Sequence, residues 1–231
     1  MLDTRVLQFV ERLRKEVIGV PQMQANGAYE YKEHSPKVVA VLKLVRAAQG
    51  VSAIALVVRS GFFVDFGALM RCANDSIEEI YFLLENYPGT NPNVDQFVAN
   101  FFEKTIDDHL TGTTPQVQTN KIRAAVVRVL KDGKQDYKTQ QRLEKIFKTF
   151  SGYVHANYAH IMEVYNGHAD DFNLRGVPSV RQRQMREAFV EIEADAVLSA
   201  SAFIARTLGL EALYQEIKAF ADEEESPEAM C

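Results

Sequence analysis

Cysteine is scarce in this sequence, and so are the short motifs that mark common enzyme and metal sites. The 231 residues include two cysteines, Cys72 and Cys231, which excludes a disulfide framework and fits a reducing compartment. Because Cys72 falls in mid-helix without a surrounding signature, we expect a small core residue rather than a nucleophile. The sequence has no glycine-rich phosphate loop and no G-x-S-x-G, H-E-x-x-H or E-x-x-H pattern. The signatures of zinc proteases and di-iron bundles are therefore missing.

Long apolar runs and an excess of positive charge are also missing. The longest apolar run, at residues 53–58, is far too short to span a bilayer. The first residues form an amphipathic pattern with interspersed charges rather than a signal peptide. The formal net charge of −5 argues against nucleic-acid binding through overall charge, although local basic faces remain. We therefore expect a cytoplasmic protein without membrane contact, for which RNA is an alternative partner that the net charge does not support.

A long apolar segment, residues 52–87, has helical periodicity. Gly61 and Gly67 inside it indicate a close helix–helix approach or a local kink. Ser52 is suited to cap the helix at its start, and Pro88 is expected to end it. We predict that this segment is the central helix of the fold. From residue 62 onward the apolar residues recur at steps of three or four, at Phe62, Phe66, Leu69, Ala73, Ile77, Ile80 and Leu84.

The remaining segments predict further helices and no sheet. Gly50 is expected to close a helix at residues 37–49, which then forms an antiparallel hairpin with the central helix. We predict an all-α fold, a helical bundle of about seven to nine helices. Residues 1–221 are expected to form a single domain, followed by an acidic disordered tail at residues 222–231. The other expected helices cover residues 4–18, 94–107, 119–131, 137–150, 180–208 and 210–221.

The polar face of the central helix carries a row of charged residues, Arg71, Asp75 and Glu78, with Glu79 nearby. Spacings of three, four and seven place the first three on one side of the helix. Two interpretations stay open. The row is either a solvated set of ion pairs with little effect on stability, or a charged constellation that faces a second helix or a ligand.

A short aromatic segment, residues 151–165, is predicted to be helical. Val154, Tyr158, Ile161 and Tyr165 follow one another at steps of four, three and four, so we expect them to form a buried stripe. His155 lies beside this stripe and is expected to be half-buried. It is either a structural histidine with hydrogen-bonded ring nitrogens or a functional residue.

The functional interpretation of His155 depends on the charged row of the central helix. If the two segments pack together on these sides, Arg71, Asp75, Glu78, His155 and Tyr158 form a candidate ligand-binding cleft. His160 lies about 140° from His155 around a helix, so the two histidines cannot chelate one metal ion.

A weak candidate for a metal site is the polar loop with His168, Asp170 and Asp171. Imidazole and carboxylate groups at this density can bind a divalent cation. Their order matches no named calcium or zinc pattern, and a hydrated loop has the same composition. We therefore expect no cofactor.

Two short stretches carry a resemblance to a known family. The first is Met70-Arg71 followed by Glu78, and the second is Ser151-Gly152-Tyr153-Val154-His155. The chain resembles bacterial all-helical domains of unknown function, which are similar in turn to distant members of the HEPN superfamily. Active members of that superfamily are RNA-cleaving toxins or phage-defence proteins, with an arginine, four to six residues and then a histidine. Here Lys148 precedes His155 by seven residues.

Three functional hypotheses follow. The favoured one is a non-enzymatic interaction or oligomerisation domain that binds a protein partner or itself through exposed helical faces. The second, implied by the resemblance, is a HEPN-like ribonuclease in which His155 is a general acid or base and Lys148 or Arg71 holds phosphate. The third is a small molecule or metal ion between the helices. The sequence alone names no substrate, ligand or partner.

Overall fold

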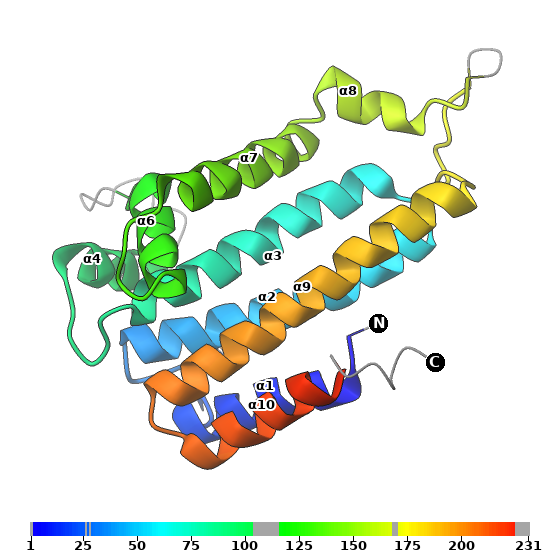
Figure 1. Ribbon diagram of the computed structural model, residues 1–231. Coiled ribbons are helices and arrows are strands. Elements are labelled where there is room, and N and C mark those ends of the chain that lie inside the picture. Colours follow the sequence, from blue (N-terminus) through cyan, green and yellow to red (C-terminus); the bar gives the residue numbers. More distant parts are fainter. Residues whose placement is uncertain (1, 26, 28, 104–115, 168–170, 225–231) are drawn as a thin grey trace.

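The computed structural model describes residues 2–25, 27, 29–103, 116–167 and 171–224. The described residues confirm the predicted all-helical bundle (Figure 1). Its helices are α1 (Thr4–Val17), α2 (Pro36–Arg59), α3 (Phe63–Leu84), α4 (Pro92–Phe101), α6 (Thr119–Leu130), α7 (Tyr137–Val154), α8 (Tyr158–Ile161), the 3-10 helix η1 (Met162–Val164), α9 (Val180–Thr207) and α10 (Glu211–Glu224).

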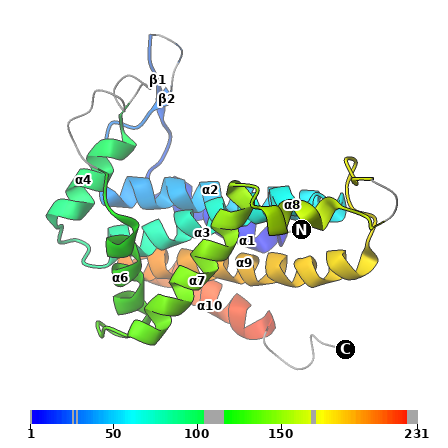
Figure 2. The ribbon, with the colours of Figure 1, turned by 90° about the horizontal axis from the view of Figure 1, so that it is seen from above.

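The prediction of no sheet was wrong in one place. β1 (Gln22–Met23) and β2 (Tyr29–Glu30) pair antiparallel in the connection between α1 and α2. This hairpin lies away from the helices (Figure 2). With two residues in each strand, it is too short to show the period-two alternation that identifies a strand in a sequence.

The prediction of one central helix at residues 52–87 was also wrong. α2 runs through Gly50 to Arg59, and the Ser52 hydroxyl donates to the Ala48 carbonyl inside the helix instead of capping a new one. The chain reverses at Gly61, which has a φ of +77°. A Cβ there would also come within 2.5 Å of the Val177 carbonyl oxygen. Only glycine tolerates both conditions, so the hairpin turn lies about ten residues beyond the predicted one.

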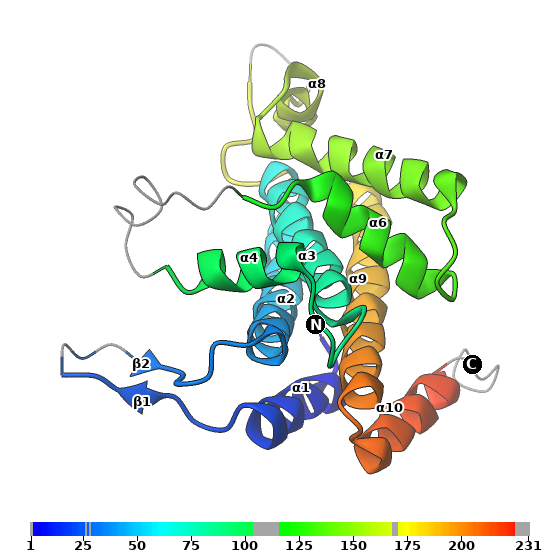
Figure 3. The same ribbon diagram turned by 90° about the vertical axis from the view of Figure 1, so that its left-hand side faces the viewer.

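Most of the apolar stripe predicted from residue 62 onward nevertheless forms the buried face of α3; Phe62 precedes the helix and is 38% exposed, and Leu69 is partly buried. Phe66, Ala73, Ile77, Ile80 and Leu84 are all buried in the core. α2, α3 and α9 form the centre of the bundle, with α1 and α10 along one side and α6 and α7 against α3 on the other (Figures 1 and 3). The polar face of α3 is therefore covered by two more helices.

The expected close approach at Gly67 is confirmed. A Cβ on Gly67 would lie 2.0 Å from Cγ of Tyr153 on α7. The tyrosine ring therefore packs directly on the backbone of α3. Its hydroxyl donates to Glu163 at 2.7 Å, and the ring of His160 lies against its edge.

α2 is the one helix among the described residues that is long and apolar enough to cross a membrane. Within the bundle, half of its most apolar window is buried against the neighbouring helices. A central core helix can have the same composition as a membrane span, so length and composition do not distinguish the two.

Two smaller expectations were wrong. Residues 222–224, placed in a disordered tail, continue α10, and Glu223 of this turn accepts a hydrogen bond from Arg5 of α1. Residues 225–231 lie outside the described residues. Cys72, expected in the core, is exposed, because it lies on the side of α3 away from the stripe.

Candidate functional site

The charged row of α3 faces other helices rather than solvent. Arg71 Nε lies 2.7 Å from Asp75 Oδ2, and Arg71 Nη1 donates to the Ser151 hydroxyl on α7. The Arg71 side chain is 17% exposed. The Asp75 side chain is 34% exposed, so the Arg71–Asp75 ion pair is only partly shielded from water.

A phenylalanine ring from α7 lies between two guanidinium groups. The Cζ atoms of Arg71 on α3 and Arg123 on α6 lie 3.2 and 3.6 Å from the centroid of Phe147. Arg123 Nε also lies 3.2 Å from Glu78 Oε2, and both side chains are largely buried. These cation–π contacts and the ion pair connect three helices, and each cation–π contact contributes about 0.5–2 kcal/mol.

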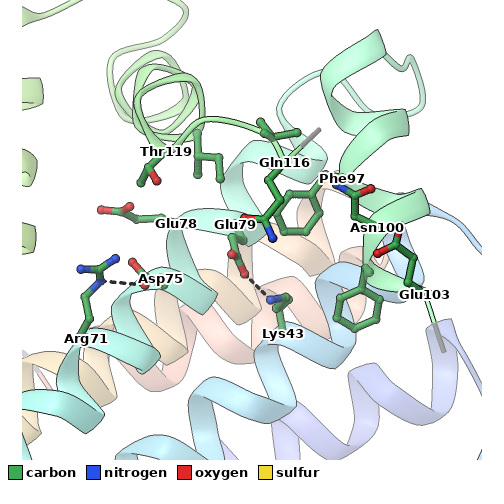
Figure 4. A pocket seen from close by; sticks show the side chains of 13 residues that line it. Lys43, Arg71, Asp75, Glu78, Glu79, Phe97, Asn100, Glu103, Gln116 and Thr119 are labelled. Carbon is green, nitrogen blue, oxygen red and sulfur yellow. Dashed lines mark hydrogen bonds and ion pairs between the residues drawn. The ribbon is translucent and has the colours of Figure 1, made fainter. Parts of the chain in front are cut away.

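A cavity of about 350 Å³ opens beside this cluster, between α2, α3, α4 and α6 (Figure 4). It combines charged, amide, hydroxyl and apolar side chains. Polar and charged side chains outnumber the apolar ones, whereas most ligand pockets have mainly apolar walls with a few polar groups. The lining residues are Lys43, Arg71, Asp75, Glu78, Glu79, Phe97, Asn100, Phe101, Glu103, Gln116, Val117, Thr119 and Ile122.

Lys43 of α2 supplies the second cation of the cavity. Its Nζ lies 2.5 Å from Glu79 Oε2 and 5.6 and 5.4 Å from the ring centroids of Phe97 and Phe101. Figure 4 shows this ion pair between Lys43 of α2 and Glu79 of α3. Two rings and a carboxylate around an ammonium group form a setting that suits cations generally.

Burial changes the protonation of the carboxyl groups in the cavity wall. Burial raises the pKa of Glu78 to about 7, against an opposing effect of the nearby Arg123. Burial also raises the pKa of Glu79, against an opposing effect of Lys43. Glu78 therefore exchanges its proton near neutral pH, and the charge of the cavity changes in that range.

The structure brings together only part of the predicted cleft. Arg71, Asp75 and Glu78 line the cavity, whereas His155 and Tyr158 do not. α7 ends at Val154, directly before His155, and Ala156 with a φ of +47° turns the chain away. The predicted buried stripe is therefore wrong: Val154 and Ile161 are exposed, and Tyr158 is 79% exposed.

Arg71 lies apart from Lys148 and His155, the other two residues of the ribonuclease hypothesis. Lys148 and His155 are both exposed, and their spacing of seven places them on one side of α7. Lys148 pairs with Glu144 at 2.8 Å. Arg71 meets α7 instead through Phe147, directly before Lys148, and Ser151, four residues before His155, on the side of α7 toward α3.

The candidate metal loop is only partly described. His168 and Asp170 lie outside the described residues, and Asp171 accepts a hydrogen bond from Asn166 at 3.1 Å. Among the residues that the structure does describe, no group of three or more histidine, cysteine, aspartate or glutamate side chains is placed to hold a metal ion.

Several residues of the cavity and its wall were missed from the sequence: Lys43, Phe97, Phe101, Arg123 and Phe147. Lys43 had a detectable signal, since it is one of two charged residues, with Arg46, in the mostly apolar stretch of residues 38–58. A lysine at such a position must find a partner when the helix is buried. The others look like ordinary members of amphipathic helices.

Comparisons with protein families, with curated proteins and with solved structures found no match. The resemblance to the HEPN superfamily therefore stays a prediction.

Proposed function

We propose that the protein is a binding domain that holds a small organic cation, such as an amine with an apolar body, in the cavity between α2, α3, α4 and α6. The observation that carries this proposal is that charged side chains from two core helices build the cavity wall. A cavity lined by charged and amide groups holds water or a polar ligand, whereas an empty packing defect is lined by apolar groups.

The charge of the wall favours a cation over a phosphate. Four carboxyl groups line the cavity, those of Asp75, Glu78, Glu79 and Glu103, against the cationic groups of Lys43 and Arg71. Both cations already contact carboxylates, at 2.5 and 2.7 Å. A phosphate would have to displace these carboxylates, whereas an ammonium group would add to the network.

Binding is tested by calorimetry with three matched probes. Phenethylamine is expected to bind, and its neutral analogue 2-phenylethanol and the anion 3-phenylpropionate are expected to bind roughly tenfold more weakly or not at all. Since Glu78 becomes neutral below a pKa of about 7, amine affinity should fall as the pH drops through that value.

The matched variants are Asp75→Asn and Glu144→Gln. Asp75 lines the cavity, and Glu144 is an exposed carboxylate on α7 outside it. Asp75→Asn should weaken amine binding by roughly tenfold, and Glu144→Gln should leave it unchanged. Equal binding of the amine and the alcohol, or tighter binding of the anion or of inorganic phosphate, would refute the proposal.

The ribonuclease hypothesis has a separate test. RNA cleavage by the purified protein that is lost in His155→Ala, with the helical circular dichroism signal retained, would support it. Arg71 lies apart from the exposed side of α7 that carries Lys148 and His155. The geometry therefore gives the ribonuclease hypothesis no support.

A second candidate function is the association with a protein partner expected from the sequence. Large apolar side chains exposed along α9 favour it.

A further inference from the structure

The first half of α9 presents an apolar stripe to solvent. Met185, Phe189 and Ile192 follow at steps of four and three, so they lie on one side of the helix, and they are 59%, 44% and 60% exposed. The neighbouring side of the helix packs on α3, where Val190 and Glu193 are buried. The stripe therefore lies on the solvent-facing side of a helix whose other sides are packed against the bundle (Figure 1).

The charges along this stripe follow a definite order. Arg181 precedes it and Asp195 follows it, and both residues are exposed. At 100° per residue the two lie about 40° apart around the helix, on the same edge of the stripe. This edge is thus positive at its start and negative about four turns later. Such an order is complementary to itself when two of these helices run in opposite directions, because the same edges of the two helices then face each other. In a parallel two-fold pair this edge would face the opposite edge of the second helix, and Arg181 and Asp195 would not meet.

We propose that α9 pairs with α9 of a second copy of this chain, antiparallel about a two-fold axis between Ala188 and Phe189. This axis sets Met185 against Ile192 of the second copy, and Ala188 against Phe189 of the second copy. It also brings Arg181 within one residue of the position opposite Asp195 of the second copy. Because the axis repeats each contact, the pairing contains two copies of every apolar contact and two ion pairs at its ends.

A second copy fits this surface better than a nucleic acid. Of the arginines that begin α9, Arg186 is committed to Glu163 and to the face of the Phe63 ring. The exposed carboxylates of Glu191 and Asp195 repel phosphate along the rest of the helix. The apolar stripe between the charges suits a protein interface, where apolar contacts lie at the centre and charges at the rim.

Sedimentation equilibrium over a range of protein concentrations tests the pairing. The wild type is expected to form a dimer. Met185→Glu should weaken it by roughly tenfold or more, because a carboxylate would be buried against Ile192 in both halves of the interface. Leu130→Glu, which changes a similarly exposed apolar residue on α6, should not. Circular dichroism verifies that each variant is folded.

A charge-exchange experiment fixes the direction of the helices. Arg181→Asp alone and Asp195→Arg alone should each weaken the dimer, and the double variant should recover most of the wild-type affinity. A wild type that stays monomeric would overturn the proposal. So would a dimer that Met185→Glu leaves intact, or single charge changes that the double variant does not rescue. Cation binding is measured independently, so either proposal can fail alone.

Discussion

Glu193 offers a direct test of how the helices pack. Its carboxyl group lies between α9 and α3 with 3% of the residue exposed. Asn74 Nδ2 donates to Oε2 at 3.2 Å, whereas Oε1 has no hydrogen-bond partner among the described residues. Burial therefore raises the pKa of Glu193 from 4.5 to about 7, against a lowering by Asn74, and no charged side chain contributes to the change.

The sign and size of the effect on stability follow from these two pKa values. Below the unfolded-state pKa of 4.5 the group is protonated in both states and costs nothing. As the pH rises toward 7, the unfolded chain ionises and the folded one does not, so the free energy of unfolding falls. The loss levels off above the folded-state pKa at about 3 kcal/mol, because each pH interval of one between the two pKa values contributes about 1.4 kcal/mol.

Glu193→Gln should remove this dependence. Urea unfolding of both proteins at about pH 4.5, 6, 7 and 8 should show the variant gaining on the wild type, by up to about 3 kcal/mol at the highest pH. The buried glutamine amide adds a constant offset, so the slope of the difference is the measured quantity. Glu78 titrates in both proteins, so its effect on stability cancels in the difference between them. Glu191→Gln, an exposed change on the same helix, is the control. A difference between Glu193→Gln and wild type that stays constant with pH would refute the reasoning.

Two further predictions concern packing around α7. Gly67→Ala should lower stability by about 1–3 kcal/mol, because its Cβ would displace the Tyr153 ring. Gly50→Ala inside α2 should be neutral or stabilising, since only the flexible end of Arg46 is closer than 3.5 Å. The thermal unfolding midpoints of the two variants measure these effects, and equal changes for Gly67→Ala and Gly50→Ala would contradict the prediction. Phe147→Leu should cost about 1–3 kcal/mol by losing two cation–π contacts, as measured in urea. Tyr137→Leu, at an exposed aromatic on the same helix, should cost little, and a similarly small loss for Phe147→Leu would contradict the expected cost.

The sequence predicts the helices of this fold well, because their apolar residues recur with a strong period. α1, α6 and α9 begin at the predicted residues and end within one residue of the prediction. The boundary between α2 and α3 was misplaced because glycine has two roles. Gly50 lies inside a helix, which costs about 1 kcal/mol and is offset by burial, whereas Gly61 adopts the left-handed conformation of the turn. Neither role can be read from the residue type.

The aromatic segment was misjudged for a related reason. Its apolar residues have the spacing of a buried helical stripe, but the chain turns at Ala156, where no glycine or proline marks a break. Once the helix is interrupted, residues before and after the turn no longer share a face. The periodicity of Val154, Tyr158 and Ile161 therefore has no structural meaning, and these side chains lie at the surface.

The charged row of α3 shows why a site of this kind cannot be read from one helix. A polar face exposed to water and a polar face covered by other helices have the same spacing. What distinguishes them lies on the covering helices: Arg123 on α6 pairs with Glu78, and Phe147 on α7 lies between Arg123 and Arg71. These partners are 45 and 76 residues away in the chain from the α3 residues that they contact. Their pairing depends on how α6 and α7 cross α3, which the periodicity of each helix leaves open. A charged row on one helix therefore indicates a covered site when the helices expected to pack on it carry an arginine and an aromatic residue at positions that face the row, and the arginine has no acidic partner on its own helix.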